Sequence, residues 1–103
     1  MSTPTATRKY EATYILDPTL PEETLTGLVE KFTGLVTNES AEGEDAPDVK
    51  NLGRRRLTYE IKGKYEGYYI SMRFDTDTAR MAELRRQLTL SDEVLRSLLL
   101  NLS

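Results

Sequence analysis

The chain contains no cysteine, no histidine and no tryptophan among its 103 residues. Without cysteine it can form neither a disulfide bond nor a thiolate metal site. Without histidine it lacks the usual general base near neutral pH and the commonest metal ligand in proteins. It also has no apolar run of about 18 residues, the length that a membrane-spanning helix needs. We therefore expect a small soluble domain in a reducing compartment, with no metal, no cofactor and no membrane association.

The charge is unevenly distributed, although the formal net charge is only −3. Residues 17–48 contain nine acidic side chains and a single base, Lys31. Residues 49–73 contain seven basic and two acidic side chains, and their densest part is the run Arg54, Arg55 and Arg56. A basic segment in an acidic chain attracts different partners from the rest of the surface, so the net charge alone says little.

The first half of the chain predicts a strand, a helix and an acidic loop. Residues 8–16 alternate apolar and polar side chains, which is typical of a half-buried strand. Pro21 is suited to the first position of a helix, and apolar residues then recur at spacings of three and four to about Asn38. Residues 39–48 are acidic and lack periodicity, which predicts a solvated loop. Residues 1–7 have no apolar core like that of a secretory signal, and we expect a flexible N-terminal segment.

The second half predicts two strands, a helix and a last strand. Residues 49–61 are extended, residues 63–67 (GKYEG) are expected to be a turn, and residues 68–74 alternate again. Residues 77–88 form the second helix, which either Thr76 or Asp77 can cap. Residues 94–102 form the final strand. Its three consecutive leucines do not show which face of the strand is buried.

This order predicts a ferredoxin-like α+β fold for residues 8–103, with a four-stranded antiparallel sheet and both helices on one face. The other face is then uncovered and suited to binding a partner. We predict that the partner contacts are Ile15, Tyr59, Tyr69 and Arg73.

The three consecutive arginines allow two interpretations. Charge on an edge strand discourages edge-to-edge pairing, and an isolated basic run is a common false signal for nucleic-acid binding. Phosphate binding instead needs several cations on one surface, and Arg8 and Lys9 begin the first strand. Arginine also offers paired donors that match a phosphate group. We predict that Arg8, Lys9, Arg55 and Arg56 form one RNA-contacting patch, and we include the neighbouring Arg54 among the candidate RNA-binding residues.

Three stretches resemble one known family over residues 8–102: RKYEATYILDPTL, LGRRRLTYEIKGKYEGYYISMRF and LRRQLTLSDEVLRSLLL. The chain is similar to the sixth protein of the bacterial small ribosomal subunit, and departs from it in the acidic insert and the short tail. The resemblance implies this same fold and no catalysis. It also implies binding to the central domain of the small-subunit ribosomal RNA, paired with the eighteenth small-subunit protein, and no DNA.

The resemblance further implies a cytoplasmic, ribosome-associated protein, bacterial or from a plastid. It points to Arg8, Lys9, Arg55 and Arg56 as contacts and does not fix the role of Arg54. One alternative is a free-standing RNA-binding module of the RRM type, which shares this strand order. Glu66 and Arg73 depart from that module's motif. A small-molecule or metal-binding regulatory domain is another alternative, but the fold alone implies no function.

Overall fold

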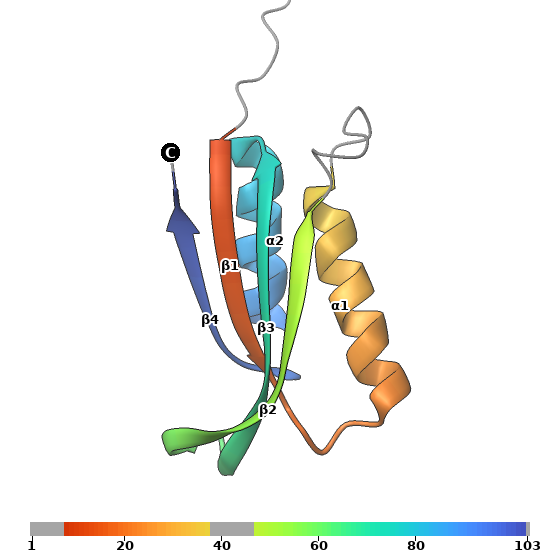
Figure 1. The fold of residues 1–103 in the computed structure, drawn as a ribbon, viewed down its shortest axis with the longest axis vertical. Coiled ribbons are helices and arrows are strands. Elements are labelled where there is room, and N and C mark those ends of the chain that lie inside the picture. The colour runs from red at the N-terminus through yellow and green to blue at the C-terminus, as the bar shows by residue number, and fades with distance from the viewer. Residues whose placement is uncertain (1–7, 38–46, 103) are drawn as a thin grey trace, which may run out of the picture.

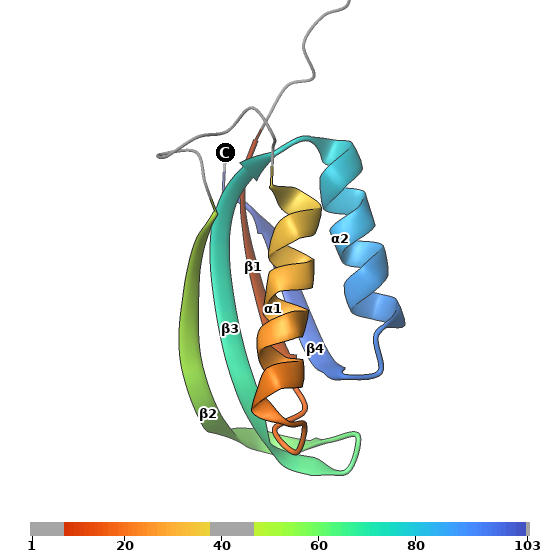
Figure 2. The same ribbon diagram turned by 90° about the vertical axis from the view of Figure 1, so that its right-hand side faces the viewer.

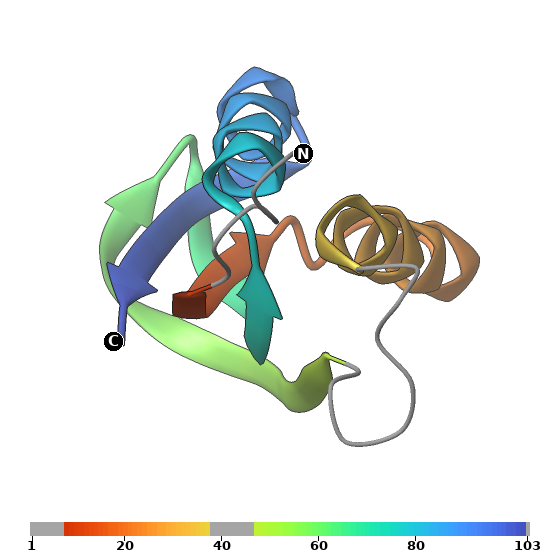
Figure 3. The same ribbon diagram turned by 90° about the horizontal axis from the view of Figure 1, so that it is seen from above.

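The computed structural model describes residues 8–37 and 47–102. The elements follow the order β1 (Arg8–Leu16), α1 (Glu22–Val36), β2 (Asp48–Ile61), β3 (Lys64–Thr76), α2 (Thr78–Leu90) and β4 (Val94–Asn101). The strands form one antiparallel sheet in the order β2-β3-β1-β4. Both helices lie on the same side of it (Figures 1 and 2). Figure 3 shows strands and helices as two layers, and the predicted ferredoxin-like fold is confirmed.

The main core lies between the sheet and the helices. β1 contributes alternate residues, as its pattern predicts, and Tyr14 packs edge-on against Phe32 of α1 with ring centroids 5.2 Å apart. α2 contributes Met81, Leu84 and Leu88, and β3 contributes Ile70, Met72 and Phe74. Removing these side chains from water is the main force that holds the helices on the sheet.

The helix boundaries differ slightly from those predicted. α1 begins after Pro21, whose φ is near that of a helix, and ends at Val36 with Thr37 as C-cap. α2 is capped by Asp77, whose carboxylate accepts a 2.7 Å hydrogen bond from the backbone N–H of Arg80. Asp48, predicted to end the acidic loop, belongs instead to β2 and pairs with Arg73. The rest of that loop (39–46) and residues 1–7 lie outside the described residues.

The prediction of a five-residue turn at residues 63–67 is wrong. Ile61 pairs with Lys64, so the β2–β3 hairpin turns through Lys62 and Gly63 alone. Both have positive φ, 49° and 79°, as the two-residue turns that match strand twist require. Lys-Gly is a weaker turn signal than Asn-Gly, which is why the sequence does not reveal it.

The hairpin bends across one end of the helix-free face (Figure 1). The pairing is irregular between Arg56 and Ile61, because Arg56 pairs with Glu66 and Ile61 with Lys64, so β2 has more residues than β3 in this stretch. The additional residues let β2 bend out of the plane of the sheet. Lys62 Nζ donates a 3.1 Å hydrogen bond to the carbonyl of Val94 at the start of β4. The far end of the hairpin is thereby fastened to the opposite edge strand.

A second apolar cluster forms under this bend, and it corrects one prediction. Ile15 was expected to be exposed for a partner, but it is buried with Leu57 and Leu95, and Tyr69 packs beside them. Gly67 makes this possible, because a Cβ there would lie only 2.1 Å from Ile15 Cγ2. Ile15 is therefore core, and only the other end of this face stays open.

Candidate nucleic-acid and partner interface

Arg54 is held by contacts within the protein. Its Nη2 atom donates a 3.0 Å hydrogen bond to the carbonyl of Pro18, and its Nη1 atom lies 3.9 Å from a carboxylate oxygen of Glu66. The first contact ties β2 to the segment that follows β1. One donor of this guanidinium is therefore used to position the strand, although the side chain stays 60% exposed.

Arg55 and Arg56 are exposed next to it, and the strand directs them to opposite faces of the sheet. They pair in register with Gly67 and Glu66 of β3. Arg55 Nε makes a long, 3.4 Å hydrogen bond to the carbonyl of Leu52. Within residues 8–37 and 47–102 neither arginine forms an ion pair. They are two cations whose charge is available to an anionic partner.

The neighbouring lysines are partly engaged. Lys64 Nζ lies 3.8 Å from Asp17, and Lys62 is bound to the carbonyl of Val94. Partial burial alone would raise the pKa of Asp17, but two hydrogen bonds from Thr19 and the charge of Lys64 lower it below its usual value. Asp17 therefore stays ionised, and Lys64 contributes less to an outside partner than Arg55 or Arg56.

Arg8 and Lys9 lie at the other end of the sheet, so the prediction of a single convergent patch is wrong. Arg8 pairs with Thr76 of β3, whereas Arg55 pairs with Gly67, nine residues away along the same strand. At about 3.3 Å per residue, this separates the two groups by roughly 30 Å. The sequence shows both groups at strand positions, but only the register shows which ends they occupy.

The predicted partner residues also divide between two regions. Tyr59 is 54% exposed and stacks on Arg96 of β4, whose guanidinium carbon lies 5.3 Å from the ring centroid. Tyr69 is half-buried beside the second cluster. Arg73 is exposed further along β3, with Nε 3.2 Å from a carboxylate oxygen of Glu11. Tyr59, Tyr69 and Arg73 can thus contact a partner, unlike Ile15.

Sequence reasoning missed the part of this face that β4 contributes. Leu99 packs against the main core, so Leu98 and Leu100 point to the helix-free side, 58% and 42% exposed. Their register partners on β1 are Thr13 and Glu11. Three consecutive leucines give no period-two signal, so only the pairing with β1 resolves their direction.

Residues 8–37 and 47–102 hold no group of three or more acidic side chains placed to share a metal ion. None of the helices in that part of the chain is long and apolar enough to cross a membrane.

These features define a class of protein: a small split βαβ domain whose exposed arginines and open sheet face are suited to binding other molecules. Comparisons with known proteins identify the family. Residues 9–101 match the family model described as ribosomal protein S6. The small ribosomal subunit protein bS6 of Clostridium botulinum is 42% identical over 93 residues, which cover 90% of this chain and 96% of that protein. Its counterpart in Halalkalibacterium halodurans is 40% identical over 92 residues, covering 89% and 94%.

Ribosomal protein S6 of Thermotoga maritima has a similar crystal structure, with a TM-score of 0.78 at 28% identity, covering 93% of this chain and 88% of that one. The chain belongs to the ribosomal protein S6 family, a family of structural, non-enzymatic proteins of the small ribosomal subunit. The predicted resemblance is confirmed.

Proposed function

We propose that this chain binds the central domain of the small-subunit ribosomal RNA together with the eighteenth small-subunit protein, in the cytoplasm of a bacterium. Membership of the family supports a ribosomal role. The observation that carries the RNA contact is the pair Arg55 and Arg56, exposed and without an ion pair within the described part of an acidic chain. Phosphate groups are the partners that such arginines favour.

Each basic site contributes a few phosphate contacts. Arg55 and Arg56 face opposite sides of β2, so they suit different phosphates of one RNA segment. Arg8 and Lys9 contact another segment at the far end of the sheet. Arg54 contributes less to RNA binding, since its guanidinium is already bound to Pro18 and lies near Glu66.

The protein partner docks on the open end of the helix-free face. Leu98 and Leu100 offer apolar area beside the charge pair of Arg73 with Glu11, and the half-buried Tyr69 borders this surface next to the second cluster. On the opposite side of the sheet, the exposed carboxylates of α1, among them Glu22, Glu23 and Glu30, oppose approach of RNA. A few cations alone give weak, salt-sensitive RNA binding, typically around 10⁻⁴–10⁻⁶ M. The partner therefore supplies the additional positive charge that tight binding needs.

The experiment is a filter-binding titration of the central-domain RNA with this chain alone, with the eighteenth protein alone and with both. Tight binding is expected only with both proteins. If this chain alone binds the RNA tightly and specifically, it behaves as a free-standing RNA-binding module, and the need for a partner is refuted.

Variants then assign the residues. Each phosphate contact that is removed should reduce the salt dependence of binding by about one unit of log–log slope. We expect a fall of about two units for Arg55→Ala/Arg56→Ala. Arg86→Ala is the matched control because Arg86 is paired with Glu83 on α2. An unchanged affinity and slope in the double variant would remove this pair from the RNA interface.

A second pair of variants tests the two-site geometry. Sites about 30 Å apart with no shared contacts should act independently. The fall in slope for Arg8→Ala/Lys9→Ala should therefore add to that of the β2 variant. A combined effect no larger than either one alone would show that the two groups do not bind at the same time.

A further inference from the structure

β4 is an edge strand with little protection against pairing with another chain. Among the described residues it pairs with β1 alone, in regular register from Ile15–Arg96 to Tyr10–Asn101. Edge strands are usually guarded by charge, proline or a bulge. From Ser97 to Leu102 the sequence has neither charge nor proline, and Leu98, Leu100 and Leu102 are 58%, 42% and 44% exposed. Such an edge can accept another strand through its backbone.

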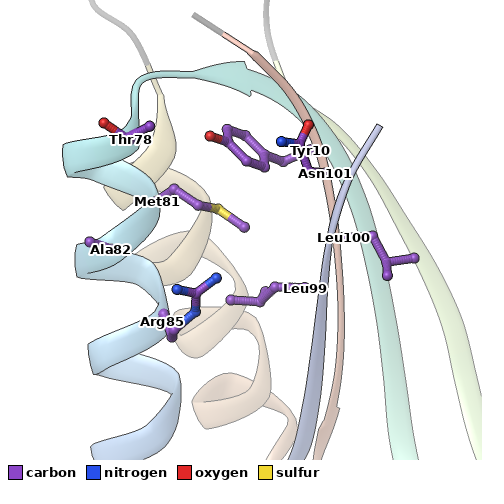
Figure 4. A pocket seen from close by; sticks show the side chains of 8 residues that line it. All are labelled: Tyr10, Thr78, Met81, Ala82, Arg85, Leu99, Leu100 and Asn101. Carbon is purple, nitrogen blue, oxygen red and sulfur yellow. The ribbon is translucent and has the colours of Figure 1, made fainter. Parts of the chain in front are cut away.

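A groove runs beside this edge, between β4 and α2 (Figure 4). Its volume is about 330 Å³. Tyr10, Met81 and Leu99 supply apolar surface, and the Arg85 guanidinium extends from α2 toward Leu99. An apolar side chain from a strand added to β4 would find a pocket here, with a cation next to it.

Arg85 differs from the other two arginines of α2. Arg80 is paired with Asp77 and Arg86 with Glu83, each one helical turn away. Within the described residues the Arg85 guanidinium makes no hydrogen bond and no ion pair. A carboxylate on the added strand would give it the partner that its neighbours already have.

We propose that the β4 edge binds an extended segment of an acidic, apolar protein partner by strand addition, distinct from the basic partner of the helix-free face. Successive side chains of a strand point to opposite sides. On the α2 side, one apolar residue enters the groove and a carboxylate two residues away reaches Arg85. On the other side, apolar residues extend the apolar surface of Leu98 and Leu100, which the basic partner also contacts. Backbone hydrogen bonds supply affinity and the groove supplies selectivity, as in other cases of strand addition.

A second copy of this chain fits the edge less well. β4 has the sequence VLRSLLLN, which contains no carboxylate. Pairing of two β4 strands would therefore leave Arg85 without an acidic partner in either copy. The positive charge of Arg85 in the groove therefore favours a different, acidic protein over a second copy of this chain.

The test uses a fluorescein-labelled heptapeptide of threonine, leucine, valine, glutamate, valine, threonine and valine, in that order. Its second and fourth residues present leucine and glutamate on one side. We expect half-saturation below about 1 mM in fluorescence anisotropy, with amide chemical-shift changes concentrated in residues 97–102. Replacing its glutamate by glutamine should weaken binding about fivefold, the scale of an exposed charge pair.

Backbone pairing is tested by two N-methylated versions, one at the third and fifth residues and one at the second and fourth. Only alternate N–H groups of a strand face the neighbouring strand. One version should lose binding and the other should keep it. Strand addition is refuted if both N-methylated peptides bind equally. It is also refuted if the unmodified peptide gives neither saturation in fluorescence anisotropy nor chemical-shift changes in residues 97–102.

Variants of the chain test the role of the Arg85 guanidinium and the role of the β4 edge. In Arg85→Gln the preference for glutamate over glutamine should disappear, whereas Arg86→Gln should keep it. Leu98→Lys should abolish binding by placing charge on the edge, and Leu90→Lys, at a leucine that is 64% exposed at the end of α2, should not. A retained preference in Arg85→Gln, or concentration-dependent dimers joined through β4, would overturn the proposal.

Discussion

Replacing Gly67 by alanine tests how the hairpin covers one end of the sheet. A Cβ atom at this position would lie 2.1 Å from Ile15 Cγ2 and 3.3 Å from Leu57 Cδ2. Non-bonded carbons normally lie about 3.5–4.0 Å apart, so Ile15 must move by more than an ångström. Ile15 has little room, because it is 8% exposed beneath Leu57 and beside Leu95. Overpacking of this kind costs about 1–3 kcal/mol.

Urea unfolding at equilibrium measures this cost. A loss of about 2 kcal/mol would lower the Tm by roughly 8–16 °C in a domain of this size. The urea midpoint should fall while the m-value stays constant, since the surface exposed on unfolding hardly changes. Gly27→Ala is the matched control: nothing lies within 4 Å of its Cβ position on α1. That change should stabilise the protein by about 0.5–1 kcal/mol, as expected for a helical glycine.

A double-mutant cycle with Ile15→Ala identifies the cause. Ile15→Ala alone should cost about 2–5 kcal/mol, because it empties part of the second cluster. It also removes the Cγ2 atom that the new methyl group would strike, so in this background Gly67→Ala should cost almost nothing. Contacting residues commonly show such coupling, on the order of 0.5–3 kcal/mol. Equal costs in both backgrounds would refute the packing of Ile15 over Gly67 and restore Ile15 as a candidate partner contact.

Three further changes test the core and the charges of α2. Tyr14→Phe should leave stability unchanged or raise it by about 1 kcal/mol in thermal unfolding, since the buried hydroxyl has no partner in the described part of the chain. Asp77→Ala should cost about 1 kcal/mol at pH 7 in urea. The hydrogen bond from the backbone N–H of Arg80 lowers the pKa of Asp77, so this cost is complete above the usual pKa of an aspartate and should shrink as the pH falls below it. Hydrogen bonding from Arg86 lowers the pKa of Glu83 from 4.5 to about 2, so the wild type should lose more stability than Glu83→Gln as the pH falls through this window.

Local patterns in the sequence predict much of the fold. Residues 8–16 alternate cleanly, and the same alternation decides which side chains of β1 enter the core. Asp77 stands directly before an apolar stripe, and of the two predicted caps, Thr76 and Asp77, it is the one that caps α2. These features depend on neighbouring residues in the chain, which the sequence shows directly.

Features that depend on pairing between distant segments were not predictable. The alternating pattern of β1 places Ile15 on the face expected to be exposed. It is buried because Leu57 and Leu95, from other strands, pack against it. Arg8 and Arg55 both belong to basic stretches, and only the register along β3 separates them. The directions of Leu98 and Leu100 likewise follow from the pairing of β4 with β1. A shift of one residue in that pairing would reverse them.

The distribution of charge over this fold bears on how such a protein can hold RNA. The cations that we propose to contact RNA lie at two ends of the sheet, about 30 Å apart. Neither end has enough cations for tight binding, and α1 exposes carboxylates such as Glu22 and Glu30 on the helical side of the sheet. The protein is therefore better suited to fixing the orientation of an assembly than to providing its affinity. A basic partner on the open sheet face would add positive charge on the side away from α1, where RNA can approach without meeting those carboxylates.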